Sequence, residues 1–174
     1  ALAISPVLFN GGATQLPNLA GAGNTYVRGI NNAGVAAAVV QSTGGNDRAA
    51  LLSNSGAVQL ASISGFNAAG AFDVNNNGIA VGYVLSNGRT NADGSLPLVG
   101  NGAGSQRAVI WTDGVATQLA SPAGAVNSVA YAIADDGTVT GMYRSTNNQV
   151  HGVVWKNGVP TTLALPSGQS RVFI

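Results

Sequence analysis

The sequence predicts an all-β fold, a β-propeller-like array of about four blades of antiparallel strands. Three observations predict it: a 44-residue repeat, turns rich in Asn, Asp and Gly, and short apolar runs rich in β-branched residues. Each repeat holds enough apolar runs for four strands, and a four-stranded unit of this length is typical of a propeller blade. A β-solenoid or an irregular sandwich is the competing architecture.

Four leucines at the ends of the last predicted strands, here called closing leucines, and three turn glycines between them define the repeat. The leucines are 44, 59 and 44 residues apart: Leu16, Leu60, Leu119 and Leu163. Each glycine follows the preceding leucine by 18 residues: Gly34, Gly78 and Gly137. The period is therefore 44, with 15 extra residues in one unit. We predict a single repeat domain over 1–174, with units at about 1–25, 26–70, 71–129 (including an insertion at 86–106) and 130–174.

Each unit is predicted to contain four strands, which in the best-defined unit cover 72–74, 79–84, 108–111 and 116–119. The first two strands flank a turn that ends in Gly78, where a positive φ is needed that other residues adopt only at a cost. The last two flank Asp113-Gly114, a two-residue hairpin signal. No segment shows a sustained helical period.

The second and third strands are apolar on both alternating faces, which indicates sheets packed between other sheets. Trp111 and Trp155 fall at equivalent positions, so we expect them in the core. Small residues recur in the second strands, namely Ala38, Gly82 and Gly141. We expect them to let neighbouring sheets approach closely near a central axis.

The repeat resembles the HAF repeats of bacterial extracellular proteins. The resemblance is carried by the turn that ends in Gly137 with the run from His151 to Trp155, and by the turn that ends in Gly78 with the run from Arg107 to Trp111. It covers nearly the whole chain except the insertion. It implies a secreted, propeller-like protein with structural motif residues and without catalytic ones. Two of the four units lack the Trp.

Composition excludes several classes of function. Charged residues make up 7% of the chain, the formal net charge is +1, and there is no Cys. We therefore expect no nucleic-acid partner and no thiolate chemistry. The longest apolar run, Val35–Val40, is too short to span a bilayer, so we expect no membrane insertion. The first residues, Ala-Leu-Ala, fit a processed secretory signal. We expect a secreted or cell-surface protein.

Catalytic and metal chemistry have few candidate residues. His151 is the single histidine, and its repeat position is held elsewhere by Ser5, Arg48 and Arg107, so we expect no enzyme and no catalytic residues. One turn matches the first half of an EF-hand loop. Its weak candidate ligands are Asp73, Asn75 and Asn77, but Val84 stands where a bidentate Glu is needed. We expect no cofactor.

The two ends of the chain and the insertion are the remaining candidates. The segment at 169–174 resembles the start of a first strand, whereas the N-terminus leads directly into a third strand. The seam either closes within the chain or joins copies into a homo-oligomer or filament. The predicted assembly edge comprises Ala1, Leu2, Ala3, Ile4, Arg171, Val172, Phe173 and Ile174. The predicted partner loop comprises Arg89, Asn91, Asp93 and Leu96.

The expected function is that of a non-catalytic extracellular structural or interaction module that assembles by exchange of terminal strands. A ligand-binding propeller, with a glycan as the ligand, is the alternative. The first hypothesis places contacts at the terminal edge, and the second needs a polar pocket near the Asn-rich turns or the insertion.

Overall fold

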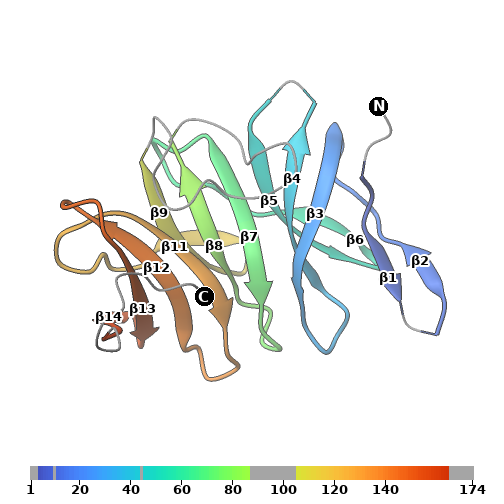
Figure 1. Ribbon diagram of the computed structural model, residues 1–174. Coiled ribbons are helices and arrows are strands. Elements are labelled where there is room, and N and C mark those ends of the chain that lie inside the picture. Colours follow the sequence, from blue (N-terminus) through green and yellow to red (C-terminus); the bar gives the residue numbers. More distant parts are fainter. Residues whose placement is uncertain (1–3, 10, 44, 87–104, 165–174) are drawn as a thin grey trace.

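The computed structural model describes residues 4–9, 11–43, 45–86 and 105–164 of the 174-residue chain (Figure 1). Its described residues form strands without any helix, as the sequence predicts. The strands are β1 (Val7–Phe9), β2 (Ala13–Gln15), β3 (Ala22–Ile30), β4 (Ala36–Ser42), β5 (Asp47–Ser53), β6 (Gly56–Gln59), β7 (Ala68–Val74), β8 (Ala80–Leu85), β9 (Gln106–Thr112), β10 (Val115–Gln118), β11 (Ala125–Ile133), β12 (Val139–Ser145), β13 (Val150–Lys156) and β14 (Val159–Thr162).

These strands form four antiparallel sheets. The first has two strands, in the order β1-β2, and the other three have four strands each, in the orders β3-β4-β5-β6, β7-β8-β9-β10 and β11-β12-β13-β14. Each four-stranded sheet is built from consecutive strands, as the repeat predicts. The sheets follow one another in a row, with β1–β2 at one end and β13–β14 at the other (Figure 1). Among the described residues, the first and last sheets do not pair.

The predicted turns are confirmed. Asp113 and Gly114 both have positive φ, at 51° and 78°, as a type I′ hairpin turn requires. Asn157 and Gly158 repeat this conformation at 51° and 76°. The turns between the first two strands of each four-stranded sheet end in glycines with φ of 75–79°, namely Gly34, Gly78 and Gly137.

The core lies between the sheets, as the apolar character of both strand faces predicts. Three clusters each join one adjacent pair of sheets, and in each a closing leucine accompanies a residue from the third strand of the next sheet. A fourth cluster joins all three four-stranded sheets. The three pairs are Leu16 with Leu52, Leu60 with Trp111, and Leu119 with Trp155. Trp111 and Trp155 are both 1% exposed, which confirms their core position.

The glycines of the second strands were expected to let neighbouring sheets approach closely, and this reason is wrong. A Cβ on Gly82 would lie 2.0 Å from the carbonyl oxygen of Gly70 in the adjacent strand of the same sheet. A Cβ on Gly141 would lie 2.1 Å from the carbonyl oxygen of Val129, also in its own sheet. The close approach therefore occurs within each sheet, beside a β-bulge, and not between sheets.

The bulges recur at one repeat position. Register shifts occur between Val27 and Gly29, between Ala71 and Asp73, and between Ala130 and Ala132. Each shift leaves one extra residue in the first strand: Arg28, Phe72 or Tyr131. A bulge bends the strand and redirects the extra side chain. These three side chains consequently meet across the sheets.

Candidate functional site: turns, bulges and an inter-sheet pocket

Hydrogen bonds join the turns of neighbouring sheets into a ladder. The side-chain nitrogen of Asn31 donates to the backbone carbonyl of Asn75 at 3.0 Å. In the same way, the side-chain nitrogen of Asn75 donates to the backbone carbonyl of Ala134 at 3.1 Å. Alongside them, the backbone N–H of Asn32 donates to Asn76 Oδ1 at 2.9 Å, and that of Asn76 donates to Asp135 Oδ1 at 2.8 Å. The ladder therefore runs in one direction, from each turn to the next.

Asn75 shows how the same residue type serves the turn and the ladder. Its Oδ1 accepts from the backbone N–H groups of Asn77 and Ile79, at 3.1 and 3.0 Å, which is an Asx turn. Asn31 does the same for Ala33 and Val35. The side-chain oxygen holds the turn, which leaves the side-chain nitrogen to bind the next sheet.

Asp73 lies where three sheets meet. Its Oδ2 accepts from the backbone N–H of Ile133 at 2.9 Å, and its Oδ1 accepts from Val74 N–H at 2.9 Å. A Cβ on Gly29 would lie 2.4 Å from Asp73 Oδ1, so glycine leaves room for this carboxylate. Asp73 thus joins its own sheet to the last one.

The weak metal candidates take part in this network. Asp73 and Asn75 accept from backbone amides, and the Asn77 side-chain nitrogen donates to the Asp135 carbonyl at 2.9 Å. Within the described part of the chain, no group of three or more His, Cys, Asp or Glu residues is arranged to hold a metal ion. The described hydrogen bonds of these three side chains hold their own turn and join it to the next sheet.

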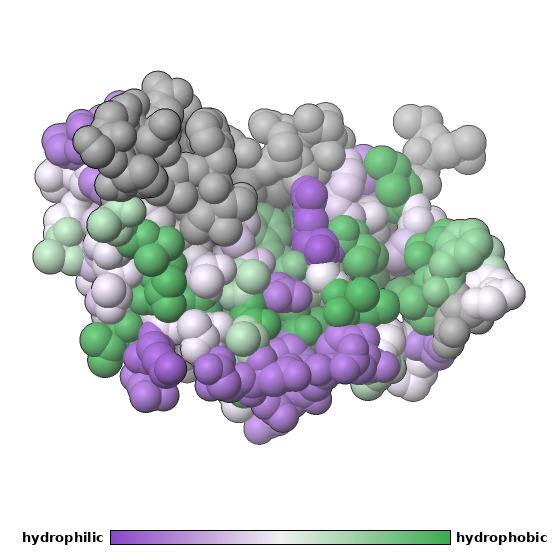
Figure 2. All heavy atoms as spheres, turned by 60° about the horizontal axis from the view of Figure 1, so that its bottom comes forward, coloured by the Kyte–Doolittle hydropathy of each residue, from purple (hydrophilic) through white to green (hydrophobic). Residues whose placement is uncertain are grey.

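A polar groove of about 310 Å³ lies along the turns. It is lined by residues of three sheets, among them Asn31, Asp73, Asn76 and Asp135. Two hydrogen bonds from Asn76, first the backbone one and then the side-chain one, hold the pKa of Asp135 below its ordinary value. Figure 2 shows hydrophilic side chains gathered along this side of the molecule, beside a band of hydrophobic ones. The groove offers amide and carboxylate groups to a polar ligand.

The three bulge residues form a stack across the sheets. The Phe72 and Tyr131 rings lie 5.4 Å apart and within 7° of parallel. The Arg28 guanidinium lies 5.8 Å from the Phe72 ring and 5.7 Å from the Tyr26 ring, within the range of cation–π attraction. Burial raises the pKa of Tyr131. Equivalent positions of neighbouring sheets thus contact each other, although the side chains at these positions differ.

Tyr83 lies beneath this stack and has an unusual hydroxyl. The side chain is fully buried, and its ring is 5.4 Å from Phe72. Its hydroxyl has no hydrogen-bond partner among the described residues. Burial raises the pKa of Tyr83 far above that of an exposed tyrosine, Asp47 raises it further, and Arg28 opposes the shift. The hydroxyl stays neutral in the folded protein.

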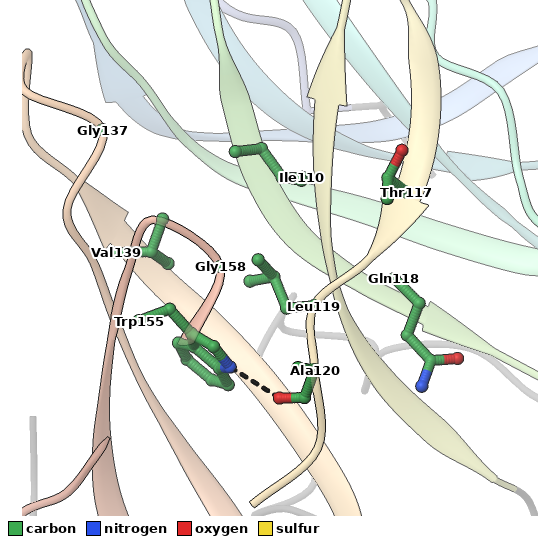
Figure 3. Close-up of a pocket in the computed structure, with 9 residues that line it drawn as sticks. All are labelled: Ile110, Thr117, Gln118, Leu119, Ala120, Gly137, Val139, Trp155 and Gly158. Atoms are coloured by element: carbon green, nitrogen blue, oxygen red, sulfur yellow. Dashed lines mark hydrogen bonds between the residues drawn. The ribbon is translucent and has the colours of Figure 1, made fainter. Parts of the chain in front are cut away.

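An inter-sheet pocket of about 420 Å³ lies between the last two sheets (Figure 3). Ile110, Leu119, Val139 and Trp155 give it an apolar lining, and the Trp155 indole N–H donates to the Ala120 carbonyl at 2.8 Å. Thr117 and Gln118 supply polar groups on the β10 side. The pocket suits a small, mainly apolar group.

The preceding sheet interface has an additional backbone hydrogen bond at the equivalent place. There the Trp111 indole N–H donates to the Ala61 carbonyl at 2.7 Å, and the Ala61 N–H donates to the Gly114 carbonyl at 3.0 Å. Ala120 and Gly158 stand at the matching positions and line the pocket. No such backbone bond joins these two in the described structure. The two interfaces therefore differ in this backbone bond.

His151 has a serine neighbour, and no described carboxylate is bonded to it. Its Nε2 lies 3.1 Å from Ser145 Oγ, and its ring stacks on Tyr143 with centroids 4.9 Å apart. Ser145 Oγ is also bonded to the Gln149 carbonyl. Within the described residues, no carboxylate is hydrogen-bonded to His151, so the third member of a Ser-His-Asp arrangement is lacking there. This Ser–His contact was not predicted from the sequence, because the two residues belong to different strands.

Most of the predicted assembly edge and the whole partner loop lie outside the described residues. The former group comprises Ala1, Leu2, Ala3, Arg171, Val172, Phe173 and Ile174; the latter comprises Arg89, Asn91, Asp93 and Leu96. Ile4 is described: its carbonyl accepts from Thr25 N–H at 2.9 Å, and its N–H donates to Asn24 Oδ1 at 3.1 Å. The N-terminal segment is thus bound to β3. At the insertion, Ser86 N–H donates to the Ser105 carbonyl at 3.0 Å, and Gln106 already belongs to β9.

The described part of the chain has no helix long and apolar enough to cross a membrane. No protein-family model, no curated protein and no solved structure matches this chain.

Proposed function

We propose that this chain is a non-catalytic extracellular module, secreted or held at the cell surface, whose function is interaction and self-assembly. Its sheets are the blades of a propeller-like array, three of them complete and one begun. The identical strand order of the three four-stranded sheets and the contacts between neighbouring sheets support this arrangement.

The single observation that carries self-assembly is the position of β1. In the other sheets the third strand is central: β5, β9 and β13 each pair on both sides. Their counterpart β1 pairs with β2 alone among the described strands, which leave its other edge unpaired. Val7 and Phe9 on this strand are exposed apolar residues. An open, uncharged strand edge favours addition of a strand from another chain.

We therefore propose that exchange of terminal strands joins copies into a homo-oligomer or filament. Sedimentation velocity over a concentration series, with electron microscopy of the same samples, tests the proposal on the full chain and on a chain that lacks 169–174. The full chain should grow in mass with concentration, and the shortened chain should grow less. Monomers at every concentration for both chains would refute self-assembly.

Glycan binding is the second candidate, and the polar groove along the turns favours it. Amide and carboxylate groups from three sheets converge there, and hydroxyl groups of a sugar can both donate to and accept from such groups. A glycan array followed by calorimetric titration tests it. A ligand that binds the wild type and not Asn76→Ala would support the groove, whereas an array without hits would leave assembly as the function.

A further inference from the structure

The two ends of the row of sheets carry exposed residues whose repeat counterparts are buried together. Phe9 ends β1 and pairs with Ala13 of β2, as its counterparts Trp111 and Trp155 pair with Ala116 of β10 and Pro160 of β14. Phe9 is 78% exposed, whereas Trp111 and Trp155 are each 1% exposed. Leu163 follows β14 and is 39% exposed, whereas the other three closing leucines are at most 6% exposed: Leu16, Leu60 and Leu119. Among the described residues, each end thus lacks the neighbour that the repeat supplies elsewhere.

The missing neighbours match. At each internal interface, the closing leucine of one sheet shares a core cluster with the third-strand residue of the next, and Leu60 with Trp111 and Leu119 with Trp155 are two such pairs. Continuing the series, the residue that should cover Leu163 is the counterpart of Trp155 in the following sheet. Phe9 holds that position in the first sheet of the chain.

Both sides of the contact are available in the same chain, and Figure 1 places them at opposite ends of the row. Within one molecule they do not meet, so a second copy is the occupant that the repeat itself specifies. Val7 lies on the same strand face as Phe9, two residues away, and is 52% exposed. Its counterparts Val109 and Val153 are fully buried. The first sheet therefore presents an apolar face with the pattern of an internal interface.

We infer that the β1–β2 face of one copy packs against the β14 end of a second copy, with Phe9 seated over Leu163 and beside Ala164. This inference rests on the proposed self-assembly and specifies its contact. The contact joins two different surfaces, so it generates a ring of copies if the rotation closes and a filament if it does not. All the residues named in this contact belong to the described part of the chain.

The test uses two variants that each destroy one end, Phe9→Lys and Leu163→Asp. Both residues are exposed in the free chain, so folding is retained, and circular dichroism verifies it. Each variant alone should self-associate at least tenfold more weakly than the wild type by sedimentation equilibrium. Val115→Asp is the matched control, because Val115 is 64% exposed but belongs to an internal sheet. This variant should assemble as the wild type does.

Mixing the two variants gives the sharper result. Phe9→Lys retains an intact β14 end and Leu163→Asp retains an intact β1 face, so an equimolar mixture should form a one-to-one dimer that grows no further. Phe9→Trp should strengthen assembly severalfold, because its indole N–H can donate to the Ala164 carbonyl as Trp155 does to Ala120.

The failures are distinguishable. Wild-type assembly that both variants leave unchanged would overturn this contact while self-assembly by strand exchange stood. A mixture that stays monomeric, with each variant monomeric alone, would also overturn it, since the two residues would then not face each other. A wild type that is monomeric at all concentrations would refute self-assembly itself.

Discussion

Asn75 is the residue through which the ladder of turns can be tested most directly. Its side chain makes three hydrogen bonds, two within its turn and one to the next sheet, and the residue is only 3% exposed. At about 0.5–1.5 kcal/mol for each bond, Asn75→Ala should lower the free energy of unfolding by about 2–4 kcal/mol. Asn75→Asp keeps both acceptor bonds, but it replaces the donor with a carboxylate oxygen that faces the Ala134 carbonyl, so it should also lower the free energy of unfolding, by about 1–3 kcal/mol.

Urea denaturation followed by circular dichroism measures both variants by linear extrapolation. Asn76→Ala is the control, since Asn76 is exposed and its bonds to Asp135 compete with water. It should cost less than Asn75→Ala. The reasoning fails if either Asn75→Ala or Asn75→Asp lies within about 0.5 kcal/mol of the wild type.

Three further predictions follow from the fold. Tyr83→Phe should leave stability at pH 7 unchanged or raise it by up to about 1–3 kcal/mol, because it removes a buried hydroxyl without a partner. The pKa of Tyr83 is raised on folding, so the stability linked to its neutral form is fully present below the unfolded pKa near 10 and is lost as pH rises above that value. From pH 7 to pH 11 the free energy of unfolding should therefore fall less in Tyr83→Phe than in the wild type, and equal falls would contradict this. Gly82→Ala should cost about 3 kcal/mol or prevent folding, since its Cβ would lie 2.0 Å from the Gly70 carbonyl oxygen, whereas Gly12→Ala, with nothing within 4 Å, should be nearly neutral in the same melts. Asp135→Asn should flatten the acid side of the stability curve: the pKa of Asp135 is lowered on folding, so its contribution is present above the unfolded value and is lost as pH falls through the folded one. Thermal melts between pH 6 and pH 2 measure this, and parallel curves would rule it out.

Much of the fold could be predicted from the sequence because turn chemistry and the repeat act locally. Gly78 and Gly114 marked hairpins that the structure confirms, with φ of 76° and 78°. The first strand of the best-defined unit was predicted too short: β7 begins at Ala68, four residues before the predicted 72. Its Ala-rich start has weak strand propensity, and packing against the preceding sheet decides its conformation.

The contacts between sheets were harder to predict. The sequence gives Asn31 and Asn75 the same place in the repeat, and this 44-residue spacing is the signal that could have revealed the ladder. The turn asparagines were interpreted as turn formers, which accounts for their Oδ1 atoms and not for their side-chain nitrogens. The bulges at Phe72 and Tyr131 left no local signal, because a register shift is a property of two paired strands.

The bonds between turns join residues one repeat apart, and this has a consequence for how such chains change in length. Asn31 binds the unit after its own, and Asn75 binds the one after that. A duplicated unit would therefore bring both the donor and the acceptor groups that join it to its neighbours, and the hydrogen bonds between the other units would be kept. Such an architecture can gain or lose whole units while the surfaces at its two extremities stay the same.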